Sequence, residues 1–385
     1  MHDTQTLSRF SILIRVTDEP CDKWPIGIEL AVKIRQSSYP FKNPDDFDYS
    51  RTLFHRLRTW LDSRRVSARL KSRAETVPLA LLSPVTFWPL ADSDVPLLFL
   101  AHNDLKFMRS LLAHYRALGV TRFICVDDQS DDGTRELLCA EPDVDVWTST
   151  VRYGEARRGK LWREALFARY GKNRWYLNID ADEYLVYDRC FEKPLPDLIA
   201  QLERLGLRRF AAPMIDMYPG GSVSAFAFDG STDVMPWAVA GCIDGNGYIL
   251  EKTKRFLSLA GGPRRRKFAA EAEMMKYPLM YWDDECSFGI SIHQPLPFDR
   301  NFSAISGVLL HFKFFADYHE KTRAAVEDKQ YFGGAREYQR ILDTVEASGD
   351  LDFVYDGTLK YASPEQLVER GFMRSIWSTG QGGGI

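Results

Sequence analysis

The chain has 385 residues, with 50 basic and 53 acidic side chains and a formal net charge of −3 at pH 7. This balance excludes the strongly basic surface of a general nucleic-acid binder. An apolar content of 45% with 27% charged residues is ordinary for a soluble globular protein, and the length suits two or three domains at roughly 150 residues each.

The cysteines and the hydropathy of the chain also narrow its class. None of the six cysteines forms a C-x-x-C pair, which argues against a zinc ribbon or a disulfide framework. The first residues lack the layout of a signal peptide, and no run approaches the roughly 18 apolar residues of a membrane span. We therefore expect a cytoplasmic protein whose only membrane contact is peripheral.

Residues 1–93 carry few clear signals. Segments 10–16 and 26–34 are candidate strands, and 51–73 has the pattern of a basic amphipathic helix with leucine, phenylalanine and tryptophan at helical spacing. We expect this helix to pack its apolar stripe on the main domain. The alternative is contact with an anionic membrane surface or an acidic partner.

A regular alternation of strands and helices begins at Val95. Each short apolar run is followed by a helical pattern, and helix 105–118 has Asn103 or Asp104 as its candidate N-cap and Gly119 at its end. Such βαβ units predict a parallel, Rossmann-like sheet with ligands beyond the carboxyl ends of its strands. The predicted strands are 96–101, 122–126, 144–148 and one starting at Trp175; the predicted helices are 105–118, 134–139 and 160–170.

Polar residues follow all four of these strands, so we expect them to meet at one edge of the sheet. Asp180-Ala181-Asp182 is the most informative, because it follows a buried apolar strand, where unpaired charge is costly. Two carboxylates on one turn can share Mg²⁺ or Mn²⁺ and leave positions for phosphate oxygens. Glu183 could be a further ligand or orient one, and a solvated acidic turn is the alternative. The other clusters are His102-Asn103-Asp104, Asp127-Asp128 and the loop 152–160.

The turn 127–134, Asp-Asp-Gln-Ser-Asp-Asp-Gly-Thr, is the second signal. A carboxylate at this position can accept hydrogen bonds from a base or from ribose hydroxyls. An acidic turn that only caps the next helix is the alternative. Farther along the chain we expect a helix at 196–205, a strand at 209–214, a glycine-rich segment 218–247 without clear periodicity, helical structure over 318–345 and a disordered tail from 380.

These motifs together resemble the glycosyltransferase family 2-like group with a GT-A fold. Asp-Asp-x-Ser-x-Asp-Gly-Thr is followed some fifty residues later by Asn-Ile-Asp-Ala-Asp-Glu-Tyr. The blocks His102-Asn103, 261–264, 276–279 and 309–313 are similar to a bacterial branch of that group, which itself resembles the family 92 glycosyltransferases. The resemblance covers about residues 95–345, and Gln129 departs from it where the common pattern has glycine.

The resemblance implies a nucleotide-sugar donor, with a UDP-sugar as our first choice, and inversion at the anomeric carbon. It also implies a divalent metal at Asp180 and Asp182, and in GT-A enzymes a late histidine sometimes completes that site. His311 is the candidate, with a hydrogen-bonded core histidine as the alternative. His293, in a predicted loop, is expected near substrate. The implied donor contacts are His102, Asn103, Asp127 and Asp128.

Basic side chains are candidates for neutralising the diphosphate of the donor. Arg157 and Lys160 lie in the loop before a predicted helix, and Arg264 follows Gly-Gly-Pro. A solvated loop or an ordinary charge run is the alternative for each of them. Inversion also needs a general base for the acceptor hydroxyl. The resemblance puts that base well downstream of Asp182, which makes Asp284, Asp283 and Glu285 the candidates, in that order.

We thus predict an α/β protein with a GT-A, Rossmann-like mixed sheet flanked by helices. Its expected parts are an accessory region 1–93, a catalytic domain 94–320, a helical segment 321–379 and a tail 380–385. The expected activity is metal-dependent inverting transfer to a glycan or lipid-linked acceptor in bacterial surface polysaccharide synthesis. One alternative is a haloacid-dehalogenase-like phosphatase with Asp180 as nucleophile. That fold normally opens with its D-x-D strand, whereas three βα units precede Asp180 here. The other alternative is a non-catalytic nucleotide-sugar or glycan-binding protein.

Overall fold

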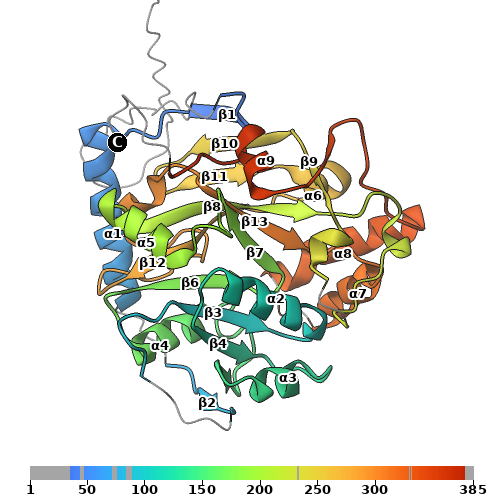
Figure 1. Ribbon diagram of the computed structural model, residues 1–385, viewed down its shortest axis with the longest axis horizontal. Coiled ribbons are helices and arrows are strands. Elements are labelled where there is room, and N and C mark those ends of the chain that lie inside the picture. Colours follow the sequence, from blue (N-terminus) through green and yellow to red (C-terminus); the bar gives the residue numbers. More distant parts are fainter. Residues whose placement is uncertain are drawn as a thin grey trace, which may run out of the picture. The chain divides into compact units, whose positions relative to one another are not determined.

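A nine-stranded mixed sheet is the centre of the fold (Figure 1). The computed structural model describes residues 35–43, 47–71, 76–83, 89–231, 234–328, 330 and 332–377, all within one compact unit, 34–385. The predicted strands 10–16 and 26–34 and the predicted tail from 380 lie outside these ranges. The sheet order is β2 (Ala80–Leu81), β5 (Val144–Thr148), β4 (Arg122–Asp127), β3 (Pro96–Ala101), β6 (Arg174–Asp180), β12 (Met275–Trp282), β8 (Arg209–Met217), β13 (Gly307–Phe312) and β7 (Glu183–Tyr187).

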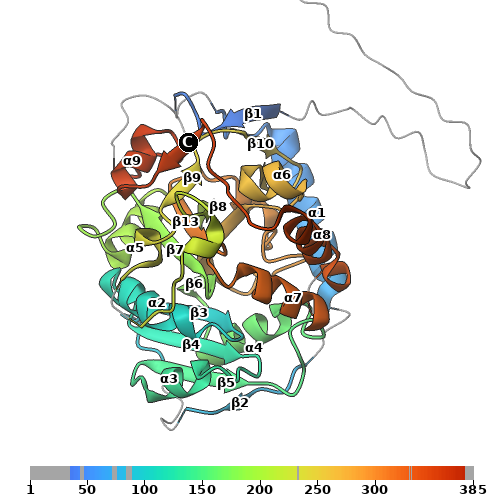
Figure 2. The ribbon, with the colours of Figure 1, turned by 90° about the vertical axis from the view of Figure 1, so that its right-hand side faces the viewer.

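The first half of the sheet is parallel, which confirms the predicted βαβ units. β4 pairs in parallel with β3 and β5, and β3 with β6. Between them lie α2 (Leu105–Ala117), α3 (Thr134–Ala140) and α4 (Lys160–Tyr170). Figure 2 shows α2 and α3 on one side of these strands and α4 on the other, because the chain builds outward from β3 and then returns past it to β6. The strand order reverses at β3, where α/β sheets bind ligands.

The second half of the sheet is mixed, and the sequence did not predict its arrangement. β12 lies between β6 and β8 and is antiparallel to both, whereas β13 is parallel to β8 and antiparallel to β7. The stretch from Trp175 to Leu185 is therefore two strands. The chain leaves β6 at Asp180, turns at Ala181-Asp182 and starts β7 at the far edge.

Smaller elements complete the unit. The segment expected to lack periodicity, 218–247, contains two short 3₁₀ helices and one strand, and the region 318–345 is two helices rather than one. A three-stranded sheet joins β1 (Arg35–Tyr39), β10 (Tyr248–Lys252) and β11 (Leu257–Ala260), and β14 (Thr358–Lys360) pairs with β9 (Cys242–Asp244). The other helices are α1 (Leu53–Lys71), α5 (Leu195–Arg204), α6 (Gly262–Phe268), α7 (Tyr318–Asp328), α8 (Phe332–Ser348), α9 (Pro364–Glu369), η2 (Val223–Ala225), η3 (Pro236–Ala238) and η4 (Phe298–Phe302).

The described part of region 35–93 packs onto the rest of the unit rather than apart from it. β1 pairs with β10, β2 pairs with β5, and the Tyr39 hydroxyl donates a hydrogen bond to the Phe372 carbonyl. The predicted boundaries at 93 and 320 stay predictions. No helix among the described residues is both long enough and apolar enough to cross a bilayer.

The orientation of α1 is opposite to the predicted one. Its inward side chains are polar, since Thr59 and Ser63 are buried, whereas Leu57 and Trp60 are 53% and 46% exposed. The expectation that the apolar stripe packs on the main domain was therefore wrong. Hydrogen bonds of Thr59 and Ser63 fix the inner face of this helix, together with the packing of the His55 ring on Phe302.

Candidate functional site

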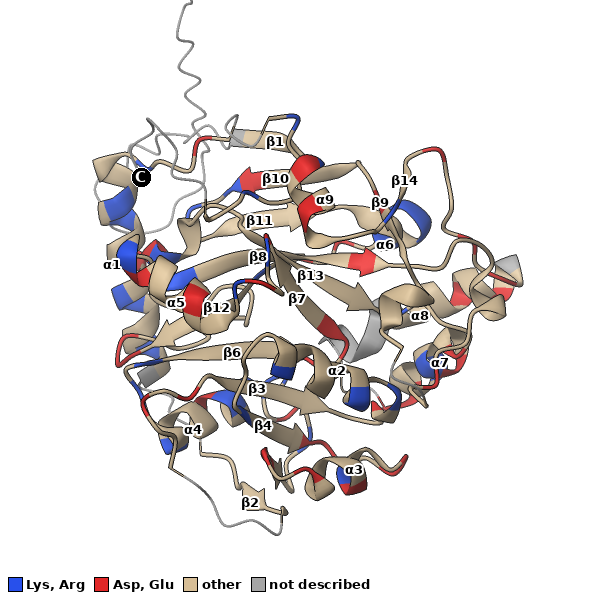
Figure 3. Ribbon diagram, in the orientation of Figure 1, with Lys and Arg blue, Asp and Glu red and all other residues tan. Residues whose placement is uncertain are grey.

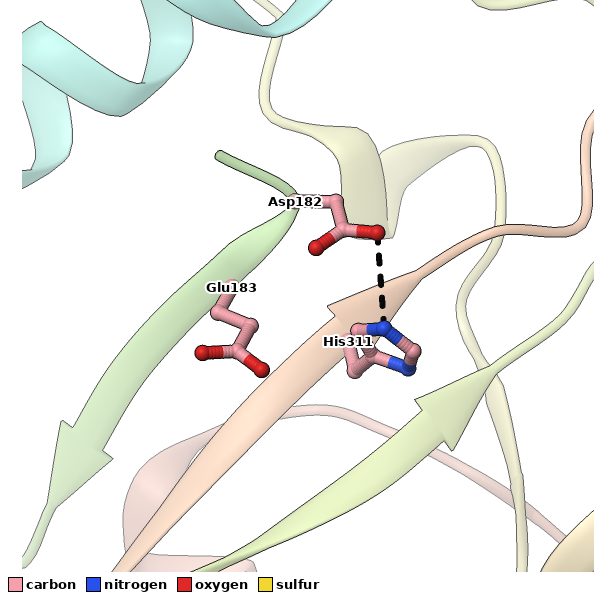
Figure 4. A group of neighbouring side chains, drawn as sticks. All are labelled: Asp182, Glu183 and His311. Carbon is pink, nitrogen blue, oxygen red and sulfur yellow. Dashed lines mark ion pairs between the residues drawn. The ribbon is translucent and has the colours of Figure 1, made fainter. Parts of the chain in front are cut away.

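Strand ends from both halves of the sheet meet at one cluster of charged side chains. The turn after β6 carries Asp182, β7 begins with Glu183, and β13 carries His311 next to Glu183 in register. One possible ligand atom from each of these three lies within 4.8 Å of the others, and Figure 4 shows Asp182 pointing toward the His311 ring. We call Asp182, Glu183 and His311 the acidic–histidine cluster.

His311 is held from both of its ring nitrogens. Nε2 lies 3.4 Å from Asp182 Oδ2, and Nδ1 lies 2.6 Å from Asp216 Oδ1. Burial lowers the pKa of His311, but the two carboxylates outweigh it and raise this pKa above its ordinary value. Without a metal the ring is thus favoured as an imidazolium. A metal ion at Nε2 would have to displace that proton.

Asp182 faces positive charge on two sides. Lys313 Nζ lies 3.3 Å from Asp182 Oδ2, the same oxygen that faces His311. Burial alone raises the pKa of Asp182, but Lys313 and His311 lower it well below its usual range. This carboxylate is therefore ionised at neutral pH and available as an oxygen ligand.

Asp180 is bound by cations rather than grouped with the cluster. One of its oxygens accepts from Arg163 at 2.6 Å and the other from Lys276 at 2.7 Å. Lys276 also donates to Glu183, so a buried ammonium lies between these two carboxylates. Asp182, Glu183 and His311 are the residues whose possible ligand atoms lie close together, and Glu183 was among the expected further ligands. The predicted place of Asp180 in the metal site stays a prediction.

The donor set of the cluster suits a divalent cation. Carboxylate oxygens are preferred by Mg²⁺ and Mn²⁺, and an imidazole nitrogen shifts the preference toward transition metals such as Mn²⁺. The Asp216 contact at Nδ1 is the outer hydrogen bond that metal-binding histidines usually make. Three protein ligands would leave coordination positions for other oxygens.

The loops after β3 and β4 are joined to each other next to this cluster. His102 Nδ1 lies 2.7 Å from the Asp128 carbonyl, and the Asn103 amide donates to Ser130 Oγ at 3.0 Å. Gln129 has φ 61°, a left-handed conformation that glycine adopts most easily, so the loop keeps a glycine-like backbone at the position where the resemblance fails.

The two carboxylates predicted to contact the nucleoside are engaged within the protein. Asp127 is fully buried and pairs with Arg135 at 2.7 Å. Asp128 accepts from Arg152 at 3.0 Å. Their role toward a nucleoside stays a prediction.

The cap of α2 comes from an unexpected residue. The Asp104 carboxylate accepts from the His102 amide at 3.0 Å and not from the helix. The amide of Leu105 instead donates to Asp132 Oδ2 at 3.0 Å, and Asp132 Oδ1 accepts from the Thr134 amide at 2.9 Å, so the acidic turn binds the first amides of both α2 and α3, in line with the alternative for that motif. Asp104 is the N-cap residue of α2, as predicted, but its side chain makes no bond to the helix.

Helix α7 lies against the loops that follow β3 and β5. Lys321 Nζ is 3.7 Å from Asp104 Oδ1, and Asp328 at its end pairs with Arg152 at 3.1 Å. Burial raises the pKa of Asp104, with a further contribution from the negative charge of Asp182. The charges of the 102–104 loop and the cluster thus act on one another.

The three basic residues proposed for diphosphate have different surroundings. Arg264 is linked to the acidic–histidine cluster through Asp216, because its Nε donates to Asp216 Oδ2 at 2.8 Å. Lys160 donates to the carbonyls of Gly289 and Ile290 at 2.8 and 3.0 Å. Arg157 has φ 53° in the turn before α4.

The three candidate bases lie away from the cluster. Because β12 is antiparallel to β6, its last residue Trp282 pairs with Arg174 at the start of β6. The acidic tripeptide therefore follows at the opposite edge of the sheet, about 20 Å along the strand from Asp180. Asp283 and Glu285 pair with Arg300, and Asp284 pairs with Lys172 at 2.9 Å. This geometry disfavours Asp284, Asp283 or Glu285 as the base for a donor bound at the cluster, and that role stays a prediction.

His293 lies close to Lys276. Its Nδ1 is 2.9 Å from the Met275 carbonyl, and burial together with the charge of Lys276 lowers its pKa to about 4. The ring is neutral at physiological pH. Its position beside the cluster is compatible with the expected place near substrate, which stays a prediction.

Four charged residues of the site had no predicted role: Arg163, Asp216, Lys276 and Lys313. A signal existed for two of them, since Asp216 and Lys276 interrupt otherwise apolar strands, and a buried charge requires a partner. Their partners come from distant segments, so the sequence did not show which charges they would meet.

Comparisons with known proteins do not assign the chain to a protein family. No protein-family model matches the chain, and no curated protein matches it. Similar solved structures include a mannosyltransferase, PcManGT from Pyrobaculum calidifontis in complex with GDP-Man and Mn²⁺, at 20% identity over 41% of this chain and 44% of that one, with a TM-score of 0.24. The chain thus spans less than half of that protein's length.

Two further structures are similar over more of their length. One is a 4-diphosphocytidyl-2C-methyl-D-erythritol synthase, at 13% identity, covering 72% of this chain and 98% of that one, with a TM-score of 0.24. The other is a UDP-glucose pyrophosphorylase in complex with UDP-glucose, at 9% identity, 72% and 97% coverage and a TM-score of 0.21. TM-scores of this size carry no argument about the function of this chain.

Proposed function

We propose that this protein is a metal-dependent glycosyltransferase of the GT-A type that uses a nucleotide-sugar donor. The observation that carries the proposal is the acidic–histidine cluster, whose ligand atoms lie within 4.8 Å of one another. It lies where the polar strand ends of an α/β sheet meet, which is the usual ligand-binding edge. The sequence motifs at 102–103, 127–134 and 178–184 support the same class.

Each charged residue of the site has a separate task in this proposal. Asp182, Glu183 and His311 would hold the metal, which would supply positive charge to stabilise the departing nucleotide diphosphate. Asp216 orients the His311 ring, and Lys313 adds a cation beside Asp182. Lys276 and Arg163 keep Asp180 in place, which fixes the turn that carries Asp182.

The donor and acceptor are proposed from the sequence resemblance. The nucleoside would lie along the loops 102–104 and 127–130, with a UDP-sugar as the first donor to test. A glycan or lipid-linked acceptor in bacterial surface polysaccharide synthesis, with inversion at the anomeric carbon, completes the proposal. None of the predicted acidic residues 283–285 is retained as the base.

A ligand screen tests the proposal directly. UDP-, GDP- and CMP-sugars are added to the full chain with and without Mn²⁺, and the melting temperature is measured. We expect one nucleotide sugar to stabilise the protein only when Mn²⁺ is present, by about 3 kcal/mol at a hundredfold excess over its Kd. Stabilisation by simple phosphomonoesters alone would favour the phosphatase instead.

Two matched variants locate the activity. Asp182→Asn removes one charge from the cluster, and we expect it to abolish Mn²⁺-dependent stabilisation and transfer while the protein stays folded. Asp284→Asn removes one charge from the exposed tripeptide, and we expect turnover to be unchanged. Full activity of the Asp182 variant would refute the metal site, and ligand binding without turnover in the wild type would favour a binding protein.

A further inference from the structure

Helix α1 is anchored through its polar face. Thr59 Oγ1 donates to the Lys254 carbonyl at 3.1 Å, and Ser63 Oγ accepts from the Phe298 amide at 2.9 Å. Asp62 pairs with Arg255 at 2.6 Å. In a surface helix the face toward the protein is usually the apolar one, so this arrangement leaves the apolar side chains of α1 facing outward.

The outward face of α1 is an apolar stripe. At about 100° per residue its members fall within one third of the helix circumference. They are five of the eleven large hydrophobic side chains that are exposed among the described residues. Exposed apolar side chains gathered on one element mark interaction surfaces more often than scattered ones do. They are Leu53 (82% exposed), Phe54 (59%), Leu57 (53%), Trp60 (46%) and Leu61 (40%).

Arginines border this stripe on both sides. On the helical wheel Arg58, Arg65 and Arg69 follow one edge of the stripe and Arg56 the other. The Arg64 guanidinium lies within the stripe, 5.0 Å from the Trp60 ring centre. Figure 3 shows these basic positions along α1, and the one acidic residue of the helix, Asp62, is neutralised by Arg255.

We propose that α1 is a membrane-surface helix that binds anionic phospholipid headgroups. An apolar stripe with tryptophan and phenylalanine, bordered by arginines, is the pattern of helices that lie in the plane of a bilayer surface. The apolar side chains would enter the acyl boundary, and the bordering arginines would pair with lipid phosphates. Charge complementarity favours an anionic surface over a second copy of the chain, since two copies of this face would bring arginines together.

The proposed surface lies away from the acidic–histidine cluster. α1 packs near residues 295–302, whose carbonyls accept hydrogen bonds from Arg209 at the start of β8. Asp216 and the cluster lie near the end of the same strand. Membrane binding would therefore leave the cluster accessible, and this inference does not depend on the proposed function.

Vesicle co-sedimentation of the full chain tests the inference. Vesicles of phosphatidylcholine alone are compared with vesicles that contain phosphatidylglycerol. We expect binding to the anionic vesicles only, with loss of binding as salt increases, because headgroup attraction is screened. No binding at low salt would overturn the inference.

Three variants separate the two parts of the surface from the rest of the chain. Leu57→Ser with Trp60→Ser removes apolar area, and Arg65→Glu with Arg69→Glu reverses charge; each is expected to lower partitioning at least about tenfold. Ile290→Ser with Val354→Ser removes exposed apolar side chains elsewhere and should bind like the wild type. Unchanged melting temperatures verify folding. Retained binding in the first two variants, or a concentration-dependent dimer that Trp60→Ser dissociates without any lipid binding, would contradict the proposal.

Discussion

Asp216 Oδ1 lies 2.6 Å from Nδ1 of His311, and the other oxygen of the same carboxylate accepts from Arg264 at 2.8 Å. The side chains of Asp216 and His311 are almost completely buried. The carboxylate therefore fixes the orientation of the imidazole ring and directs Nε2 toward Asp182. A side chain that is not itself a proposed metal ligand thus fixes the geometry of the proposed metal site.

Asp216→Asn should weaken Mn²⁺ binding by about 10- to 100-fold, because the outer partner of a ligating histidine both orients it and raises its basicity. Calorimetric titration with Mn²⁺ measures this. Asp244→Asn is the matched control. Asp244 is also buried, and it pairs at 2.7 Å with Arg266, which lies on α6 as Arg264 does. Both variants should lose stability, but only the first should lose metal affinity. Equal Mn²⁺ affinities would show that Asp216 is merely structural.

Lys276→Met should destabilise the protein by about 3–5 kcal/mol, because it leaves the carboxylates of Asp180 and Glu183 without their shared ammonium. Added Mn²⁺ should restore more stability to this variant than to the wild type, since the cation offsets the same repulsion. Urea unfolding with and without Mn²⁺ measures both effects. Lys172→Met, which removes an exposed pair with Asp284, should cost less than about 1 kcal/mol and respond to Mn²⁺ like the wild type.

Metal affinity should increase with pH while His311 titrates. The pKa of His311 is raised above its ordinary value of 6.5, so the folded protein holds this proton to higher pH than the unfolded chain. The stability that the imidazolium adds is complete below pH 6.5 and is lost as pH rises through the raised pKa. Mn²⁺ competes with the same proton. Titrations between pH 6 and about 9 should show tightening in the wild type. A similar slope for His311→Gln would exclude His311 as the origin.

His114 should make the protein sensitive to acid. Burial lowers its pKa from 6.5 to about 4, although its contact with the Leu185 carbonyl opposes the change. The unfolded chain therefore takes up a proton between pH 6.5 and 4 that the folded protein refuses, and the stability present above pH 6.5 falls by about 3 kcal/mol over this range. Comparing the unfolding free energy of His114→Gln with that of the wild type at both pH values isolates this effect. Parallel pH curves would contradict it.

The sequence predicted the first half of the sheet well, because β3 to β6 and their helices form locally repeated βαβ units. It could not predict that β12 is inserted between β6 and β8, since antiparallel pairing of segments about a hundred residues apart leaves no local signal. The same limit applied to the site. Asp182, Glu183 and His311 were predicted near one another, but Lys276 reaches Asp180 and Glu183 across 96 and 93 residues, and no local signal showed this pairing.

One prediction failed and another is disfavoured, each for a physical reason visible in single residues. The base candidates at 283–285 were chosen by their distance along the chain, whereas the reversed direction of β12 carries them to the other edge of the sheet. The apolar stripe of α1 was expected inside. Thr59 and Ser63 face inward instead, because the adjoining segments offer a carbonyl at Lys254 and an amide at Phe298 that need hydrogen-bond partners.

The inserted strand β12 also affects how the protein can mature on the ribosome. β6 is finished at residue 180, but the strand that covers its second edge begins only at Met275. At about 5–20 residues per second of synthesis, the nascent chain exposes an apolar strand edge beside an acidic turn for several seconds or longer, with only Arg163 to balance its charge. β12 then covers this edge and brings Lys276, and His311 follows later on β13. Chains truncated before residue 275 are therefore expected to depend on chaperones and to aggregate, however complete the parallel half of their sheet.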